Sequence, residues 1–557
     1  MIMSGFMSTI RIRIIIFLIC VNIFNSNNLN AAIYFVDGAK HNADNANAGT
    51  ITSPWKTIQR AANAACAGDT VFIRQGVYKE GFFTTHNGDL AQGHIVFSSY
   101  KGEKVILEGE DVNTTNTGII IQNDYIKLTG IEIADWNTGI WLGGAGFTEI
   151  SGCEVHDVSF GIGAGNGAHD FILNNVEIHH FDLYGFDASP SGGADCYNGT
   201  LVNCTAHTSR DPEQNVDGFA LGHGTQHNFT FTNCTTYNVF DGFDISSRDV
   251  IIDRCIAYNC SNGGFKLWQD NIKLINSISY NCEITNVELD WDGQPGASTL
   301  INCTFYGAKV FSIWVENAAD TLKMYNCIIA GGDNIGLAFE QTGNLNYFGD
   351  YNIFHSNNSA RAVSVGYNDE FSTDQVKNGE WAAYSNQDFH SKTIDSLNTL
   401  FMNLTENDLH LKKEGIAVDN GTADNAPFYD FEGNARPSGK AWDIGAYEYQ
   451  FETGINFDET KDNYFRQQEI LQNYPNPFNS STKIVYSISE KTNVDVFVCA
   501  VNGVIVKRLF SGCQNKGDYS IIWDGTDESG KSAGNGIYLT VVKYGAGFSV
   551  IKIALLK

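Results

Sequence analysis

The chain has 557 residues and a formal net charge of −28, with 56 glycines and only 8 prolines. Nucleic-acid binding needs a basic surface, so this charge argues against a nucleic-acid partner. Globular domains usually split beyond about 250–300 residues, which leaves either several domains or one long repeat array. The abundance of glycine, asparagine and β-branched residues favours strands and turns, and hence the repeat array.

The chain begins with a candidate export signal. The basic residues Arg11 and Arg13 precede a short apolar run, and the small residues Ala31 and Ala32 follow it. This order is typical of a secretory signal peptide, and the apolar run is too short to span a bilayer. We expect residues 1–31 to be removed. The mature protein is then a monomer without a membrane span, secreted or held at the cell surface after export through the periplasm.

Residues 33–85 read as the entry to the repeat array. The stretch SPWKTIQRAANAA, starting at Ser53 or Pro54, has the amphipathic pattern of a helix. This opening resembles the N-terminal cap of many right-handed β-helix proteins, in which a helix covers the open end of the core. We therefore expect one helix here, before the first full coil.

Between about residues 125 and 340 the chain repeats itself. Most repeats are 21 to 26 residues apart, which is one coil of a β-solenoid that buries its face only by stacking on its neighbours. One matched column contains Ile131, Cys153, Val176, Cys204, Cys234, Cys255, Ser277, Cys303 and Cys327. A second contains Gly139, Gly161, Gly185, Gly218, Gly242 and Gly264. The fold class is therefore all-β: a right-handed parallel β-helix over residues 32–450.

The 13 cysteines allow two interpretations. In an exported chain, many cysteines suggest a disulfide framework. Here many of them fall at one position of the repeat, which favours a buried column in which free cysteine packs as a small apolar side chain. We prefer the column and keep the disulfides as the alternative.

A different unit follows the solenoid. Residues 341–450 are less regular and end in a stretch that resembles the C-terminal closure of β-helix proteins, and residues 451–468 form a linker. Residues 469–557 alternate strands with Asn-Gly and Asp-Gly turns, which predicts a small β-sandwich. This unit resembles the C-terminal sorting domain of type IX secretion systems, which implies an export address and the type IX machinery as a partner. The matching residues are Tyr474, Pro475, Asn476, Pro477, Phe478, Trp523, Asp524, Gly525, Gly536 and Tyr538.

Four ionisable residues fall in register with the glycine column. Asp217 and Asp241 each precede a column glycine, and Asp244 and Lys266 each lie two residues after one, on successive coils. Equivalent residues of successive coils form ladders about 4.8 Å apart, so these side chains should form one charged cluster. Three converging carboxylates repel one another unless a cation is present, and oxygen ligands from short turns suit Ca²⁺.

The run NVDGFA, then DGFD, then NGGFKL resembles the family-9 polysaccharide lyases, which are parallel β-helix pectate lyases. The resemblance implies that Asp217, Asp241 and Asp244 bind Ca²⁺ and that Lys266 is the catalytic base. The family pattern has one more aspartate, where this chain has Phe240. Asp187, in the same outward column on an earlier coil, is a candidate substitute.

The implied activity is calcium-assisted β-elimination on an acidic polysaccharide such as polygalacturonate. Lys266 would remove the C5 proton as a general base, for which its pKa must fall. We expect Arg210, Arg248 and Arg254 to hold neighbouring uronates, with an ordinary surface role as the alternative.

Two other functions are compatible with the pattern. A polygalacturonase-type glycoside hydrolase would use paired carboxylates, and Gly222-His223-Gly224 resembles a short motif of those enzymes. A non-catalytic carbohydrate-binding solenoid would need neither calcium nor Lys266. Two further groups are weaker. Strand alternation predicts that His179 and His180 point to opposite faces. Glu288, Asp290 and Asp292 allow two interpretations, an acidic substrate subsite or a solvated turn, and we prefer the turn.

Overall fold

The computed structural model describes residues 31–451 and 470–555, except 111–115, 190–193, 223, 225, 290–295, 318–319, 333–334, 341–344, 357–360, 367, 475, 477, 489–490, 501–504, 535 and 545–546. The predicted signal peptide up to residue 30, most of the predicted linker, His223, Asp290 and Asp292 therefore lie outside the described residues. Among the helices that are described, none is long and apolar enough to cross a membrane.

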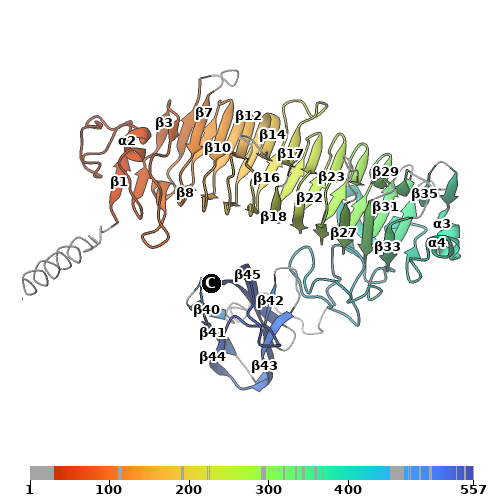
Figure 1. The fold of residues 1–557 in the computed structure, drawn as a ribbon. Helices are drawn as coiled ribbons and strands as arrows, with labels where there is room; N and C mark the ends of the chain where they lie inside the picture. The colour runs from red at the N-terminus through yellow and green to blue at the C-terminus, as the bar shows by residue number, and fades with distance from the viewer. Residues whose placement is uncertain are drawn as a thin grey trace, which may run out of the picture. The chain divides into compact units, whose positions relative to one another are not determined.

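The chain divides into two compact units. The first comprises Met1–Asp182 with Asp187–Thr200, and the second comprises Leu183–Phe186 with Leu201–Lys557. In both units the coils of a right-handed parallel β-helix carry three short strands each, as Figure 1 shows from red through green. The predicted fold class is confirmed.

The strands of the first unit form three parallel ladders. The first ladder contains β1 (Ile33–Val36), β2 (Thr70–Ile73), β5 (Ile95–Ser99), β8 (Ile126–Thr129), β11 (Glu149–Ser151) and β13 (Ile172–Asn174). The second contains β3 (Gly76–Tyr78), β6 (Val105–Glu108) and β9 (Glu132–Ala134), and the third β4 (Phe82–Phe83), β7 (Thr117–Ile121) and β10 (Thr138–Gly143). The long strand β12 (Glu154–Gly165) pairs with both β9 and β10. The long β14 (Glu177–Ala188) and then β15 (Thr200–Val202) follow it in the chain.

The second unit repeats the same three ladders with regular coils. The first ladder contains β18 (His227–Thr232), β21 (Arg248–Asp253), β24 (Ile272–Ile275), β27 (Ala297–Ile301), β30 (Thr321–Tyr325) and β33 (Tyr347–Asp350). The second contains β16 (Thr205–His207), β19 (Thr235–Tyr237), β22 (Ile256–Tyr258), β25 (Ile278–Tyr280), β28 (Thr304–Tyr306), β31 (Ile328–Gly332), β34 (Ile353–Ser356) and β37 (Lys392–Thr393). The third contains β17 (Asp217–Leu221), β20 (Asp241–Ile245), β23 (Gly263–Leu267), β26 (Thr285–Leu289), β29 (Phe311–Val315), β32 (Ile335–Phe339) and β35 (Val363–Val365).

Asparagine makes the turn between the first and second ladders. The residue before the cysteine column has a left-handed backbone, with φ of 46° at Asn276, 52° at Asn302 and 54° at Asn326. Asparagine tolerates this conformation better than most residues, because its short side chain can hydrogen-bond locally. Repetition of Asn-Cys along the chain therefore repeats the same turn in each coil.

The core of each coil is apolar and stacked. Phe219, Phe243 and Phe265 stack on successive coils, with ring centroids 5.0 and 4.9 Å apart. The column cysteines, among them Cys255 and Cys303, are fully buried, and every described cysteine is a free thiol. The stacked-column interpretation is confirmed over the disulfide framework.

The predicted N-terminal helix is present but begins later. Helix α2 covers Ile58–Ala62, with the side chain of Thr57 as its N-cap. Trp55 forms an extended bridge with Val36. The expected start at residue 53 or 54 is therefore wrong, because the first strand of the solenoid holds this segment extended.

Two short helices and a flanking segment end the β-helix. After β36 (Asp369–Phe371), helices α3 (Thr373–Lys377) and α4 (Glu380–Ser385) bring Trp381 against Phe339 and Tyr347. Residues 394–446, with η3 (Leu397–Thr399), β38 (Phe401–Asn403), η4 (Leu404–Glu406) and β39 (Asp408–Leu411), pack in one apolar cluster with residues of β25, β31 and β34. The segment expected to form the last coils and closure thus lies along the side of the coils.

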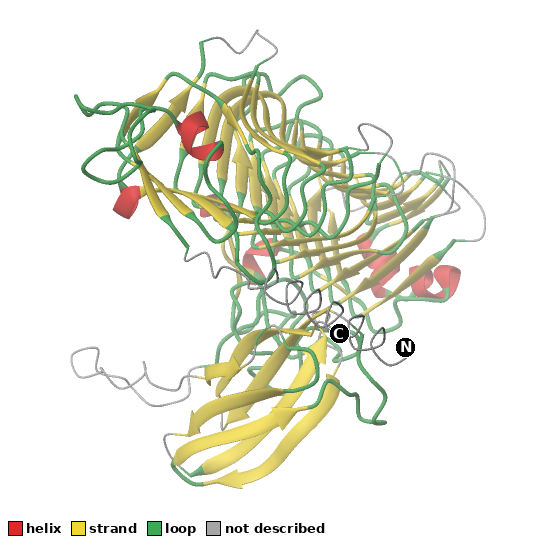
Figure 2. Ribbon diagram, turned by 60° about the vertical axis from the view of Figure 1, so that its left-hand side comes forward, coloured by secondary structure: helices red, strands yellow, loops and turns green. Residues whose placement is uncertain are grey.

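The C-terminal unit is a small β-sandwich, as predicted. One sheet contains β40 (Ile470–Tyr474), β41 (Thr482–Ile488) and β44 (Gly517–Trp523). The other contains β42 (Thr492–Ala500), β43 (Ile505–Gln514), β45 (Gly536–Tyr544) and β46 (Gly547–Leu555). It has its own core, which includes Phe478, Val496 and Trp523. Figure 2 shows its strands in yellow.

Candidate active site

The third ladder of the second unit carries the predicted charged residues. Asp217 pairs with Asp241, and Ala220, Asp244 and Lys266 occupy equivalent positions of β17, β20 and β23. The predicted register is therefore observed. Because Phe243 and Phe265 point into the core, strand alternation turns Asp244 and Lys266 outward.

Glycine allows this close stacking. An added Cβ at Gly242 would lie 2.5 Å from the carbonyl oxygen of Gly264 on the next coil. At Gly264 it would lie 2.2 Å from the hydroxyl of Ser279. A side chain at either position would push adjacent coils apart, so the column glycines fix the spacing of the charged residues beside them.

The three aspartates converge. One oxygen from each of Asp217, Asp241 and Asp244 lies within 4.8 Å of the others. Asp217 and Asp241 are buried and Asp244 is partly buried. Two oxygens that bind one Ca²⁺ at about 2.3–2.6 Å are at most about 5 Å apart, so this donor set fits such an ion.

Asp241 is the centre of the cluster. Its carboxylate accepts hydrogen bonds from the Gly263 N–H and the Asn262 side-chain amide, both at 2.9 Å, and from Lys266 Nζ at 3.2 Å. Burial raises the pKa of Asp241 above its ordinary value, although these donors act in the opposite direction. The contacts of Asn262 and Gly263 could not be predicted from the repeat, because they depend on the turn before β23.

Lys266 is held by contacts on several sides. Besides Asp241, its Nζ lies 4.7 Å from the centre of the Trp268 ring. Burial lowers the pKa of Lys266, but the neighbouring carboxylates outweigh this and raise it above the ordinary value. Asp241 contributes most, followed by Glu288 and then Asp244.

Glu288 is a member of the site that the repeat alignment missed. It pairs with Lys266 on the next coil and is buried, which corrects its assignment to a solvated turn. Asn286 takes the place of the column glycine in this coil, so the glycine pattern ends before it. Aligning TNVEL with GGFKL would have placed Glu288 beside Lys266.

The three candidate arginines lie in different places. Arg210 is in the loop before β17, and Pro212 of that loop accepts a hydrogen bond from Ser261, which is next to Asn262. Arg248 is exposed at the start of β21 and pairs with Asp249 at 3.2 Å.

Arg254 takes the place of the asparagine in the turn before Cys255. It pairs with Asp253 and lies over the ring of Tyr429. Of the three arginines, Arg210 is the one whose loop contacts the immediate neighbour of Asn262.

Two other predicted groups lie in the first unit. Burial raises the pKa of Asp187 to about 6, and Ser189 donates to both of its oxygens. The expectation that His179 and His180 point to opposite faces is wrong, because their Nδ1 atoms are 2.6 Å apart. His180 has a left-handed backbone with φ of 54°, which breaks the strand alternation.

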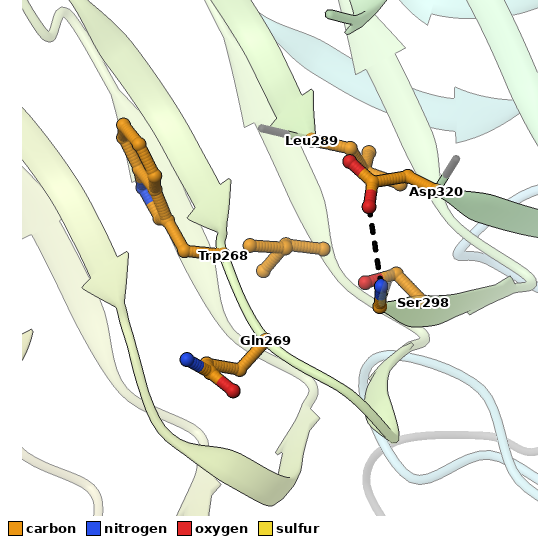
Figure 3. Close-up of a pocket in the computed structure, with 7 residues that line it drawn as sticks. Trp268, Gln269, Leu289, Ser298 and Asp320 are labelled. Carbon is orange, nitrogen blue, oxygen red and sulfur yellow. Dashed lines mark hydrogen bonds between the residues drawn. The ribbon is translucent and has the colours of Figure 1, made fainter. Parts of the chain in front are cut away.

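A narrow hollow lies beyond the end of β23 (Figure 3). Leu267, Trp268, Gln269, Leu289 and Asp320 contribute to its lining, and Asp320 accepts a hydrogen bond from the Gly296 N–H at 3.2 Å. Its empty volume is about 170 Å³. Small-molecule pockets start at about 300 Å³, so this hollow is too small to hold a ligand of that class.

Comparison with known proteins agrees with this geometry. Residues 34–307 match the Pel9A-like right-handed β-helix region, a span that contains the whole aspartate and lysine cluster. This part of the chain is therefore similar to a Pel9A-like β-helix. Residues 481–547 match the FlgD Ig-like domain, which fits the C-terminal sandwich.

The relatives of the Pel9A-like region are distant. Pectate lyase PEL9 of Emericella nidulans is 26% identical over 204 residues, which is 36% of this chain and 46% of that protein. An uncharacterized protein, YwoF of Bacillus subtilis, is 32% identical over 119 residues, 21% of this chain and 25% of that protein. The chain thus spans less than half the length of these curated relatives. The crystal structure of pectate lyase Pel9A superposes with a TM-score of 0.44 and 17% identity, covering 75% of this chain and 96% of that one.

Proposed function

We propose that the protein is a polysaccharide lyase that cleaves a polyuronate by β-elimination, with Lys266 as the base. One observation carries this proposal: the amine of Lys266 lies 3.2 Å from Asp241, beside three carboxylates whose oxygens lie within 4.8 Å of one another. The match of residues 34–307 to the Pel9A-like region and the name of the pectate lyase relative support it. The predicted export signal would suit a polymeric substrate found outside the cell.

In this proposal the aspartates and Lys266 have different roles. Asp217, Asp241 and Asp244 would hold Ca²⁺, which supplies positive charge for binding the uronate carboxylate and makes the C5 proton more acidic. Asp241 also positions the amine of Lys266 through its hydrogen bond. Phe240 offers no oxygen, so the protein contributes three carboxylates here.

The elimination requires the base in its neutral state. The C5 proton passes to Lys266 Nζ, the C5–H electron pair becomes the C4–C5 double bond, and the C4–O bond breaks. The departing sugar oxygen takes a proton from water. Because the carboxylates raise the pKa of Lys266, any positive charge that offsets them makes the neutral amine easier to form.

The test is the ultraviolet absorbance of the unsaturated product, measured with the full-length protein on polygalacturonate with calcium or with a chelator. Lys266→Met should lower the rate by about 10²–10⁴-fold, the usual contribution of a general base. Lys273→Met is the matched control, since Lys273 lies on the first ladder, and it should keep the wild-type rate. New reducing ends without unsaturation would instead indicate hydrolysis, and neither signal on any polyuronate would leave a binding solenoid.

We also propose that the C-terminal sandwich is an export address read by a type IX secretion system. The residues that match the sorting domain and the separate core of this unit support the proposal. Removing residues 470–557 should leave the protein inside the producing cell, and normal export of the truncated chain would contradict it.

A further inference from the structure

The first unit contains two histidines whose ring nitrogens face one another. His179 and His180 are neighbours on β14, and their Nδ1 atoms are 2.6 Å apart. His179 is partly buried and His180 is exposed, so the pair is accessible from solvent. Both nitrogens are bases, and at this distance the space between them holds one proton or one metal ion. The surroundings of the pair indicate which of the two it suits.

A carboxylate fixes the tautomer of His179. Glu154 Oε1 lies 3.2 Å from His179 Nε2. Because a carboxylate accepts hydrogen bonds, Nε2 carries the ring proton, and Nδ1 presents its lone pair toward His180. Metal-binding histidines have the same arrangement, in which an outer carboxylate selects the tautomer and orients the ring. His179 is therefore already in the protonation state of a metal ligand.

The preceding coil has the same arrangement with one difference. His156 stacks on His179, with ring centroids 5.0 Å apart and planes at 2°, which restrains the ring of His179. The Nε2 of His156 faces Glu132 at 3.4 Å. Its Nδ1 faces the carboxylate of Asp157 at 2.7 Å, where the next coil has a second histidine. Two carboxylates suit a protonated histidine, whereas a histidine partner suits a neutral one, which is the form that binds metals.

The corner after the second ladder directs His180 toward His179. This corner has a left-handed backbone in successive coils, with φ of 53° at Asp157 and 54° at His180. Because the fold fixes this backbone in each coil, the two imidazoles are brought together before an ion binds, and little ordering remains to be done. Asparagine, which tolerates the conformation, fills the same corner in later coils at Asn238, Asn259 and Asn281.

The spacing of the two nitrogens suits an ion that binds neighbouring ligands at a right angle. With metal–nitrogen bonds of about 2.0–2.1 Å, two nitrogens are about 2.9 Å apart at a right angle and about 3.3–3.4 Å apart in a tetrahedron. The observed 2.6 Å is nearer the first value. Right-angled coordination by nitrogen and oxygen is typical of Cu²⁺ and Ni²⁺. The described residues offer no third histidine, cysteine or acidic ligand atom within 4.8 Å of both nitrogens, so water would complete the coordination.

We propose that His179 and His180 chelate a divalent transition-metal ion of the Cu²⁺ or Ni²⁺ class through their Nδ1 atoms, with Glu154 holding the tautomer of His179. On binding, the proton of His180 moves from Nδ1 to Nε2, and the ion takes its place between the rings. The site belongs to the first unit, whereas Asp241 and Lys266 belong to the second, so the inference does not depend on the proposed elimination.

Titration calorimetry of the full-length protein with Ni²⁺, in an excess of Ca²⁺, tests the site. Glu154→Gln should weaken the affinity about tenfold, as the loss of an outer carboxylate does, and His180→Asn should weaken it further. Asparagine keeps the left-handed corner, so this variant should fold normally. His86→Asn is the matched control and should keep the affinity, because His86 is exposed in the same unit and its Nδ1 lies 3.0 Å from the hydroxyl of Thr85.

Electron paramagnetic resonance with Cu²⁺ identifies the ligands directly. The wild-type protein should show coupling to two nitrogens, and His180→Asn should show coupling to one. An ion that bound the aspartate cluster instead would bind His180→Asn as tightly as the wild type, and this result would overturn the site. Equal losses of affinity in His180→Asn and His86→Asn would also overturn it, since they would show binding by scattered surface histidines.

Discussion

The second unit contains two buried charged clusters that differ in how their charges are balanced. Around Arg436, the guanidinium is fully buried and donates to Glu448 at 2.9 Å and to the backbone carbonyls of Gly445 and Ala446. Around Lys266, three aspartates converge on one another, and one of them, Asp241, pairs with the amine. Both clusters gather several carboxylates around one cation, and they differ in the donors that these carboxylates meet.

The carboxylates near Arg436 are satisfied by backbone amides. Glu448 accepts the N–H groups of Ser438 and Asp443, and Asp443 accepts those of Asp419 and Tyr449. Arg436 also reaches Asn276 in the Asn-Cys turn, which ties the flanking segment to the coils. The comparison teaches that backbone amides can satisfy one group of buried carboxylates (the closed cluster), whereas our proposal assigns an external cation to the other group.

The largest expected effect comes from breaking the closed cluster. Arg436→Met should lower the free energy of unfolding by about 3–5 kcal/mol, because it leaves Glu448 as a buried charge without its partner. Chemical denaturation measures this. The control is Arg248→Met, whose exposed pair with Asp249 should be worth less than about 1 kcal/mol. Equal losses for the two variants would show that the Arg436 cluster is not structural.

Calcium should stabilise the folded protein through the other cluster, the three aspartates beside Lys266. At a hundredfold excess over its Kd, calcium should add about 2.7 kcal/mol to the free energy of unfolding, and a chelator should remove this gain. Asp241→Asn should abolish the gain, because it removes a converging ligand. The exposed-surface control Asp249→Asn should keep it. A gain that persists in Asp241→Asn would place the ion elsewhere.

The smallest effect, counted per pH unit, is a pH dependence of the closed cluster. Burial, with help from Glu448, raises the pKa of Asp443 to about 7, against about 3.9 for an unfolded aspartate. The folded state then binds the proton more tightly, so Asp443 favours folding at low pH, and this contribution is lost as pH rises from about 4 to about 7. Asp443→Asn should flatten the slope of stability against pH by at most about 1.4 kcal/mol per unit. An unchanged slope would mean that Asp443 is ionised throughout.

Much of the site was predictable because the repeat fixes its register. Once the column glycines Gly218, Gly242 and Gly264 are aligned, Asp244 and Lys266 must lie on adjacent coils, as they do. The same alignment ends at Asn286, so the position of Glu288 beside Lys266 was not predicted. A repeat therefore predicts the positions of side chains only in those coils that still carry the column glycine.

The sequence by itself determined the β-helix, its cysteine and asparagine turn columns, the C-terminal sandwich and the ladder of charged residues, because parallel stacking converts a repeat in the chain directly into a column in space. Only the tertiary structure decided that Asn262 and Gly263 bind Asp241, and that the segment around Arg436 lies along the coils. The reason is physical. Strand ladders follow a fixed period of two residues and one coil, whereas turns and irregular segments are placed by side-chain packing and backbone hydrogen bonds between residues far apart in the chain.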